Sequence, residues 1–244
     1  MMVKIMNGIG QIVEGINASF EALKNNRVRK LHVLKNIDNE SYKLKKIIEI
    51  STSQNILIEY IDKKDWAFHS RHSIVAECDE LKTYDESNIQ ELNINKLIIL
   101  DHLQDTQNLG AIVRSAAAFD FLGVCIPKKR SVQISERTFS ISSGGLEKVK
   151  IVYFNSIFSL LKKLKSLNYW TIGLDMDSKI KLNNLDLEGQ KIALLMGGEE
   201  SGLSDEVLNK IDAVTHIEMS GLMESLNVSV AAGIAMQHFF KKNS

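Results

Sequence analysis

The sequence has few of the residues that build disulfide frameworks, metal sites or membrane helices. It contains one proline and two cysteines in 244 residues, and Cys78 and Cys125 have no metal-like spacing. The six histidines are scattered, and none forms a ligand pair at zinc spacing. No apolar run approaches the roughly eighteen residues of a membrane helix, and no basic-then-apolar leader opens the chain. We therefore expect a cytoplasmic protein without a metal, with each cysteine as a buried structural thiol in a reducing compartment.

The chain as a whole also lacks an excess of charge of one sign. Lys and Arg number 30, as do Asp and Glu, so the total charge gives no sign of nucleic-acid binding. A hydrophobic content of 44% and a charged content of 25% are typical of an ordinary globular protein. The length allows two modest domains or one large domain.

The local distribution of charge is more informative than the total. Residues 24–46 and 128–150 are rich in Lys and Arg, whereas residues 77–91 carry an acidic excess. The acidic stretch is also low in apolar residues, so we interpret 81–94 as a linker between two domains. The two basic stretches could form one phosphate-facing surface, or they could be solvated helix faces. Charge alone leaves both interpretations open.

Alternating helix and strand patterns predict a small α/β domain over residues 1–80. An amphipathic helix is predicted from Glu14 to Leu23, and a Lys-rich helix from Tyr42 to Ile50. The predicted strands of this domain are Leu31–Leu34, Ile56–Tyr60 and Ile74–Cys78.

Residues 95–244 alternate strand and helix throughout, which predicts an α/β fold with a parallel sheet covered by helices on both faces. The sole proline, Pro127, ends a strand, where it does not break a central ladder. No Gly-x-Gly-x-x-Gly follows the first strand, and this argues against ordinary Rossmann-type methyltransferases and dehydrogenases. The predicted strands are Leu97–Leu100, Leu122–Ile126, Ile151–Phe154, Trp170–Leu174, Ile192–Met196 and Val214–Met219, and helices are predicted to begin near Leu109, Ile157, Ser204 and Val228.

Three segments share one pattern, in which an apolar strand leads into a polar loop with glycine and then into a helix. They cover residues 100–118, 193–203 and 217–233. The third segment brings Ser225 and Asn227 to the start of an Ala-rich helix. One such residue suffices to cap a helix, so the second suggests a polar site built on the helix N-terminus.

The first two segments contribute an arginine and a pair of glycines. Arg114 stands among Val113 and small apolar residues, which suggests a half-buried side chain that binds an anion such as a phosphate. From these residues alone, a plain surface arginine is the preferred interpretation. Gly197-Gly198 leaves the backbone bare for a flat ligand, although a simple strand-to-helix turn has the same pattern.

Together, in this order and spacing, the three segments resemble the signature motifs of the SpoU/TrmH family, RNA ribose 2′-O-methyltransferases of the SPOUT superfamily. The resemblance covers residues 95–241 and implies a deep C-terminal trefoil knot. Many of these enzymes carry a front domain similar to RNA-binding ribosomal proteins, and Gly15-Ile16-Asn17 resembles its opening. Relatives usually have His-Gln-Gly where this chain has Arg71-His72-Ser73, a departure that bears on the choice of RNA target.

The resemblance also implies a cofactor, S-adenosylmethionine, and no metal. It implies backbone contacts from Gly197, Ile217 and Leu226 to the adenosine, with Gly198 and Met219 lining the same slot. On this interpretation, Gly197→Val abolishes cofactor binding by filling the space that the adenosine needs.

For the chemistry, the resemblance implies that Arg114 activates the ribose hydroxyl, while Asn108, Glu199, Ser225 and Asn227 shape the pocket. Guanidinium groups essentially never lose a proton in proteins, so electrostatic stabilisation and phosphate anchoring are safer roles for Arg114 than that of a base. The length and front domain look most like bacterial enzymes that methylate a guanosine of large-subunit (23S) ribosomal RNA, and transfer-RNA methylation is the alternative. A non-catalytic RNA-binding protein would be expected to have lost one of these residues, and none is missing.

The resemblance finally implies a homodimer, paired through the C-terminal helix and the helix of the first motif. The helix from Val228 to Phe240 is apolar on nearly all its faces. The core of one chain buries only part of such a helix, so an apolar face is left for another partner. We expect its small residues to permit close approach of a second copy, and Met236 and Phe240 to fill the seam. Complete burial within one chain is the alternative.

Overall fold

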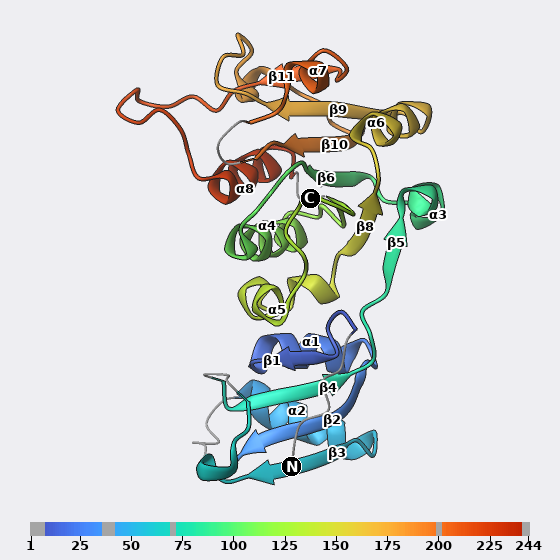
Figure 1. The fold of residues 1–244 in the computed structure, drawn as a ribbon, viewed down its shortest axis with the longest axis vertical. Helices are drawn as coiled ribbons and strands as arrows, with labels where there is room; N and C mark the ends of the chain where they lie inside the picture. The colour runs from blue at the N-terminus through green and yellow to red at the C-terminus, as the bar shows by residue number, and fades with distance from the viewer. Residues whose placement is uncertain (1–7, 36–41, 69–71, 199–201, 241–244) are drawn as a thin grey trace. The chain divides into compact units, whose positions relative to one another are not determined.

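The computed structural model describes residues 8–35, 42–68, 72–198 and 202–240. Within them the chain forms two units, each considered by itself below. The first contains Met1–Leu81 and Ile134–Lys148, and the second contains Lys82–Gln133 and Val149–Ser244 (Figure 1).

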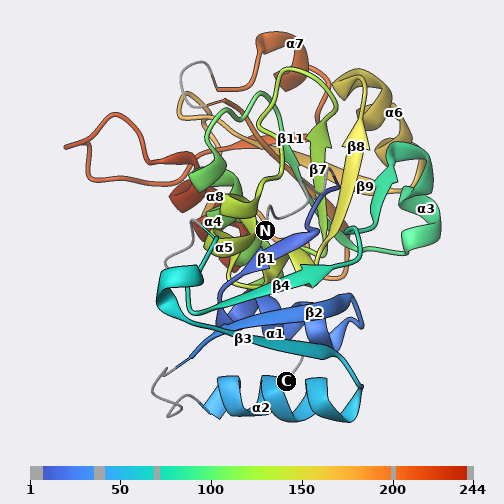
Figure 2. The same cartoon turned by 60° about the horizontal axis from the view of Figure 1, so that its bottom comes forward.

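The first unit is a four-stranded sheet with helices packed on it, as the alternating pattern predicts. The strand order is β1-β4-β2-β3, with β4 antiparallel to β1 and β2, and β2 parallel to β3. Helices α1 and α2 pack against each other and against strands of this sheet, and α5 packs on β1 (Figure 2). The elements are β1 (Ile12–Glu14), α1 (Ile16–Lys24), β2 (Val28–Leu34), α2 (Tyr42–Ser53), β3 (Leu57–Ile61), β4 (Ile74–Cys78), α5 (Glu136–Ser142) and the short 3₁₀ turn η3 (Gly145–Glu147).

Residues 134–148 join this unit although they follow it far along the sequence. Glu147 of η3 forms a buried ion pair with Arg27, and Asn25 donates a 2.7 Å hydrogen bond to the Glu147 carbonyl. Arg27 also donates to the carbonyl oxygens of Gly10 and Asp79, at 2.7 and 2.6 Å. Burial raises the pKa of the Glu147 carboxyl, and the Arg27 guanidinium opposes this shift. Part of the second basic stretch, predicted as a charged surface, thus belongs to the core of the first unit.

The second unit is built on a seven-stranded sheet of order β11-β9-β10-β6-β7-β8-β5, in which every neighbouring pair is parallel. The prediction of a parallel sheet is confirmed. The strands are β5 (Thr83–Asp85), β6 (Lys96–Leu100), β7 (Gly123–Pro127), β8 (Lys150–Phe154), β9 (Tyr169–Leu174), β10 (Lys191–Met196) and β11 (Ala213–Thr215). Pro127 is indeed the last residue of its strand. The strand predicted at Val214–Met219 ends at Thr215, so the residues after it are free to form a loop.

The stretch 81–94, predicted as a linker, contains regular structure. Strand β5 pairs with β8, and it is followed by the turn η2 (Glu86–Asn88) and the helix α3 (Ile89–Leu92). Ile89 is fully buried in the core of the second unit. Ile94 belongs to the same cluster, and Tyr84 and Leu92 pack against it, so several apolar residues dock this acidic segment onto the sheet, which the charge pattern could not reveal.

Helices cover both faces of this sheet. Leu97, Ile99 and Leu195 share one buried cluster with the leucines of α6 (Ile157–Ser166). Alternate residues of a strand face opposite sides, and Ile98 and Leu194 between them are also fully buried. Helices α4 (Thr106–Ala118) and α8 (Val228–His238) pack side by side, and α8 contacts β10 (Figure 1). The short helix α7 (Asp205–Leu208) lies between β10 and β11 in the sequence.

Helix α8 buries only one of its faces. Met236 is fully buried within the chain, and the ring of Phe240 lies 5.8 Å from that of Phe119. The expectation that Met236 fills a seam with a second copy is therefore wrong, because its side chain is already buried within the single chain, whereas Phe240 is partly exposed and its role in a seam stays a prediction. Val230 and Ile234, one turn apart, remain 49% and 40% exposed.

Both cysteines are free and buried, as predicted. Burial raises the pKa of the Cys78 thiol and of the Cys125 thiol to about 12. Over the part of the chain that the structure describes, no helix is both long and apolar enough to cross a membrane.

Candidate functional site

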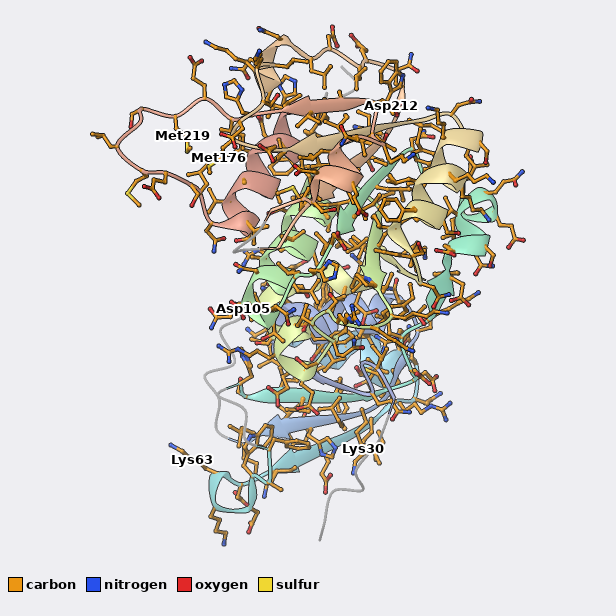
Figure 3. The ribbon with its side chains drawn as sticks, turned by 45° about the horizontal axis from the view of Figure 1, so that its top comes forward. Lys30, Lys63, Asp105, Met176, Asp212 and Met219 are labelled. Carbon is orange, nitrogen blue, oxygen red and sulfur yellow. The ribbon has the colours of Figure 1, made fainter. Side chains whose placement is uncertain are left out.

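The carboxyl ends of the central strands form the edge where a site is expected. In an open parallel sheet the loops that leave these ends meet at one side, and ligands bind there. β9, β10 and β11 end at Leu174, Met196 and Thr215. Met176 and Met219, from the loops after β9 and β11, lie close together at this edge (Figure 3).

A cavity of about 520 Å³ opens among these loops and the start of α8. This volume lies within the range of small-molecule sites. Seven of the ten predicted site residues line it: Gly197, Gly198, Ile217, Met219, Ser225, Leu226 and Asn227. The second and third motifs, separate in sequence, thus converge on one cavity.

Position 197 requires glycine because the backbone of residues 202–203, in the loop that borders the cavity, packs directly against it. A Cβ atom at Gly197 would lie 2.0 Å from the carbonyl carbon of Gly202 and 2.4 Å from the amide nitrogen of Leu203. The amide of Gly202 in turn donates a 3.1 Å hydrogen bond to the carbonyl of Gly198. Gly197→Val would therefore break this loop closure, and the expected loss of binding would come from distortion of the wall, not from occupied adenosine space.

The N-terminus of α8 holds the polar groups of the third motif. The side-chain oxygen of Asn227 accepts hydrogen bonds from the amide and the hydroxyl of Ser229, at 2.9 and 2.6 Å, and so caps the helix. Its amide nitrogen donates a 3.1 Å hydrogen bond to the side-chain oxygen of Asn108 in α4. Asn108 is buried. One side chain thus caps a helix and joins the first motif to the third.

The loop after β6 is tied to the cavity wall at a second point. The Asp101 amide donates a 2.8 Å hydrogen bond to the Met196 carbonyl at the end of β10. The Asp101 carboxylate lies 2.8 Å from Nδ1 of His102, whose backbone is left-handed with φ of 59°. His102 approaches Gly198, since a Cβ there would lie 3.3 Å from the His102 carbonyl. The first motif therefore borders the cavity without forming its lining.

Arg114 does not have the half-buried position that its apolar sequence neighbours suggest. It is exposed on α4 and does not line the cavity. The expectation of a half-buried arginine is wrong, because Val113 turns inward while the next residue, about 100° further round the helix, points to solvent. Glu199, the remaining predicted residue, lies outside the described residues.

Sequence reasoning missed one wall of the cavity. Asp175, Met176 and Asp177 line it, together with His216 and, on α8, Ala231. The available signal was the polar run directly after the strand at 170–174, in the same position as the motif loops. Among the described residues, no group of three His, Cys, Asp or Glu side chains is placed to hold a metal ion. The arrangement suits a flat ligand with a polar or charged end.

Comparison with known proteins gives a family. Residues 95–237 match the model of the SpoU rRNA Methylase family. The chain is 32% identical over 245 residues to YacO of Bacillus subtilis, named as a TrmH family tRNA/rRNA methyltransferase, covering 95% of this chain and 96% of YacO. It is 31% identical over 240 residues to RlmB of Xylella fastidiosa, a 23S rRNA (guanosine-2′-O-)-methyltransferase. This match covers 95% of this chain and 96% of RlmB.

Solved structures show the same fold. The SpoU methyltransferase AviRb from Streptomyces viridochromogenes, in complex with AdoMet, superposes with a TM-score of 0.78 at 19% identity, covering 94% of this chain and 88% of AviRb. The AdoMet-bound rRNA methyltransferase from Sinorhizobium meliloti superposes with a TM-score of 0.76 at 18% identity. The superposition covers 93% of this chain and 85% of that enzyme. The motif loops, the parallel sheet and the match over more than half of its length establish that the chain belongs to the SpoU rRNA Methylase family.

Proposed function

We propose that the protein transfers a methyl group from S-adenosylmethionine to a ribose 2′-hydroxyl of RNA, at a guanosine of 23S ribosomal RNA. The observation that carries the proposal is the cavity at the strand ends, whose lining includes seven residues that the family motifs imply. Full-length similarity to RlmB supports the guanosine of 23S rRNA. The YacO name also mentions tRNA, and tRNA methylation is the second candidate.

The cavity fits the proposed cofactor. Apolar side chains of Met176, Met219 and Leu226 offer surfaces for an adenine ring, and Gly197 and Gly198 leave backbone groups accessible beside them. AdoMet is bound in the AviRb and Sinorhizobium structures of the same fold. When bound, the cofactor supplies a methyl group activated by a sulfonium.

The protein's own task is then to place the ribose and to manage charge. The 2′-oxygen would form a bond to the methyl carbon as the sulfur–carbon bond breaks, and the hydroxyl proton would pass to solvent water, so alignment is the main requirement. Ser225 and Asn227 lie at the cavity and can orient the ribose, and the hydrogen bond from Asn227 to Asn108 fixes the Asn227 amide. Arg114 keeps its proton, so we assign it to RNA phosphate binding and to stabilisation of the developing oxyanion. Glu199 would complete the pocket.

We also propose a homodimer that brings Arg114 to the cavity of a second copy. Arg114 is exposed and outside the cavity of its own chain, and α4, which carries it, packs beside α8. Val230 and Ile234 leave an apolar strip on α8 for pairing. Light scattering should give about twice 27.4 kDa. Mixing two inactive variants, Arg114→Ala and Asn227→Ala, should restore part of the activity, and a monomeric mass would contradict the dimer.

We assign the roles of the two units and the location of the protein from the family resemblance. The first unit, which contains most of residues 1–80, is the RNA-binding domain, and the second is the catalytic domain with a deep C-terminal trefoil knot. An enzyme that modifies ribosomal RNA acts in the cytoplasm.

The experiment that tests the function is a map of ribose methylation in cells. Total RNA from cells with and without the gene is compared at every nucleotide by resistance of 2′-O-methylated positions to alkaline cleavage. Loss of one guanosine methylation in 23S rRNA is expected. Loss at a tRNA position would favour the second candidate, and an unchanged map would contradict both.

A further inference from the structure

The charged residues that line the cavity are all acidic. Asp175 and Asp177 contribute carboxylates, and the described lining contains no Lys or Arg. His216 is the other titratable residue of the lining. Among the described residues, neither carboxylate forms an ion pair with a lysine or arginine. Within the described residues, two carboxylates therefore border the cavity without a lysine or arginine partner.

The backbone holds this acidic wall in place. The Asp175 amide donates a 2.9 Å hydrogen bond to the Thr215 carbonyl at the end of β11, and the Ser178 hydroxyl donates one of 2.6 Å to the Val214 carbonyl. The Asp177 amide donates a 2.9 Å hydrogen bond to one side-chain oxygen of Asp175. The loop after β9 is thus fixed to the neighbouring strand, and the Asp175 carboxylate is positioned before a ligand arrives, while Asp177 follows it in the same loop.

We infer that Asp175 and Asp177 select the cationic cofactor over its neutral product, a specificity that rests on the proposed function. S-adenosylmethionine carries a sulfonium, an ammonium and a carboxylate, with a net charge of about +1 near neutral pH, whereas S-adenosylhomocysteine has lost the sulfonium charge. Transfer of the methyl group to the ribose oxygen leaves a neutral thioether, so the attraction to the two carboxylates weakens at that step. The product then leaves more readily.

Calorimetry on the full chain at pH 8, above the range in which imidazole groups generally titrate, measures this selection. Asp175→Asn and Asp177→Asn keep the side-chain oxygen that accepts a hydrogen bond but remove the charge. Each variant should weaken S-adenosylmethionine binding by about fivefold, the upper range for a partly exposed charge pair, and should change S-adenosylhomocysteine binding by less than about twofold. Glu218→Gln is the matched control, because this exposed carboxylate lies 2.6 Å from Lys181 and does not line the cavity. It should leave both affinities unchanged.

A salt series on the wild-type protein gives a readout that needs no variant. Raising the ionic strength should weaken S-adenosylmethionine binding more than S-adenosylhomocysteine binding, because salt screens the interaction with charge. The double variant should lose this difference. Equal changes for the two ligands, or none, would overturn the selection while leaving the proposed cofactor intact. Failure of the wild-type protein to bind either ligand would overturn the proposed function itself.

Discussion

The amide nitrogen of Asn227 donates a 3.1 Å hydrogen bond to the side-chain oxygen of Asn108, across 119 positions of sequence. This contact joins the N-terminal turns of α4 and α8, the two helices that carry the first and third motifs. The same Asn227 side chain caps α8 through Ser229. Its two roles can be separated by mutation.

Replacing Asn227 should show that the inter-helix bond serves activity and the cap serves stability. Asn227→Ala removes both and should lower the free energy of unfolding by about 1–2 kcal/mol. Asn227→Ser restores a capping oxygen but is too short to reach Asn108. Chemical denaturation should show most of the stability regained in the Ser variant, while methyl transfer stays at least about tenfold below wild type. Recovery of both together would mean that only the cap matters.

Filling the cavity should abolish cofactor binding without breaking the loop at Gly197. Ala231 lies on α8 and lines the cavity, so the ring of Ala231→Phe would occupy part of its volume. Calorimetry should show a loss of S-adenosylmethionine affinity of about a hundredfold or more, whereas Ala231→Ser, at the same position and of nearly the same size, should bind within a few-fold of wild type. Normal affinity in the Phe variant would place the cofactor elsewhere.

Loss of Arg114 should affect turnover far more than cofactor binding. Its side chain lies outside the cavity of its own chain, so Arg114→Ala should keep S-adenosylmethionine affinity within a few-fold while losing most of kcat. Arg114→Lys should rescue little, because an ammonium lacks the two-pronged geometry of guanidinium. Single-turnover assays decide between these outcomes. A rate near that of wild type in either variant would remove Arg114 from the mechanism.

The buried thiols should resist modification over a wide pH range. The thiolate is the reactive form, and burial raises the pKa of Cys78 and Cys125 to about 12, so both remain protonated in the folded protein at pH 7–9. Labelling with a thiol-reactive dye should therefore be slow in this range and should become fast for both cysteines once the chain is unfolded in denaturant. Fast labelling of the folded protein at pH 8 would contradict the burial of that thiol.

The sequence predicted those features that depend on local pattern. β6, β10 and the start of α8 fall where apolar runs and a capping asparagine indicate them, because strand burial and helix capping act over a few residues. The meeting of 197–198 with 225–227 was implied by the family resemblance, and the cavity at the carboxyl ends of the parallel strands agrees with it.

Features that depend on distant partners could not be predicted in this way. Residues 134–148 pack with the first unit through the ion pair of Glu147 and Arg27, which no local pattern encodes. Arg114 faces solvent because the phase of α4 is set by its packing on the sheet and on α8, not by the neighbours of Arg114 in sequence. Asp175 and Asp177 were overlooked because acidic residues after a strand are common in surface loops.

The central claim is that the methyl group is placed on a ribose oxygen of RNA. Purified protein is incubated with methyl-labelled S-adenosylmethionine and unmodified 23S rRNA, and the labelled RNA is hydrolysed in alkali. A 2′-O-methyl group blocks cleavage of the adjacent phosphodiester, so the account predicts that the label is recovered in an alkali-resistant dinucleotide beginning with guanosine. Recovery of the label in a mononucleotide methylated on its base, or no transfer to RNA at all, would contradict it.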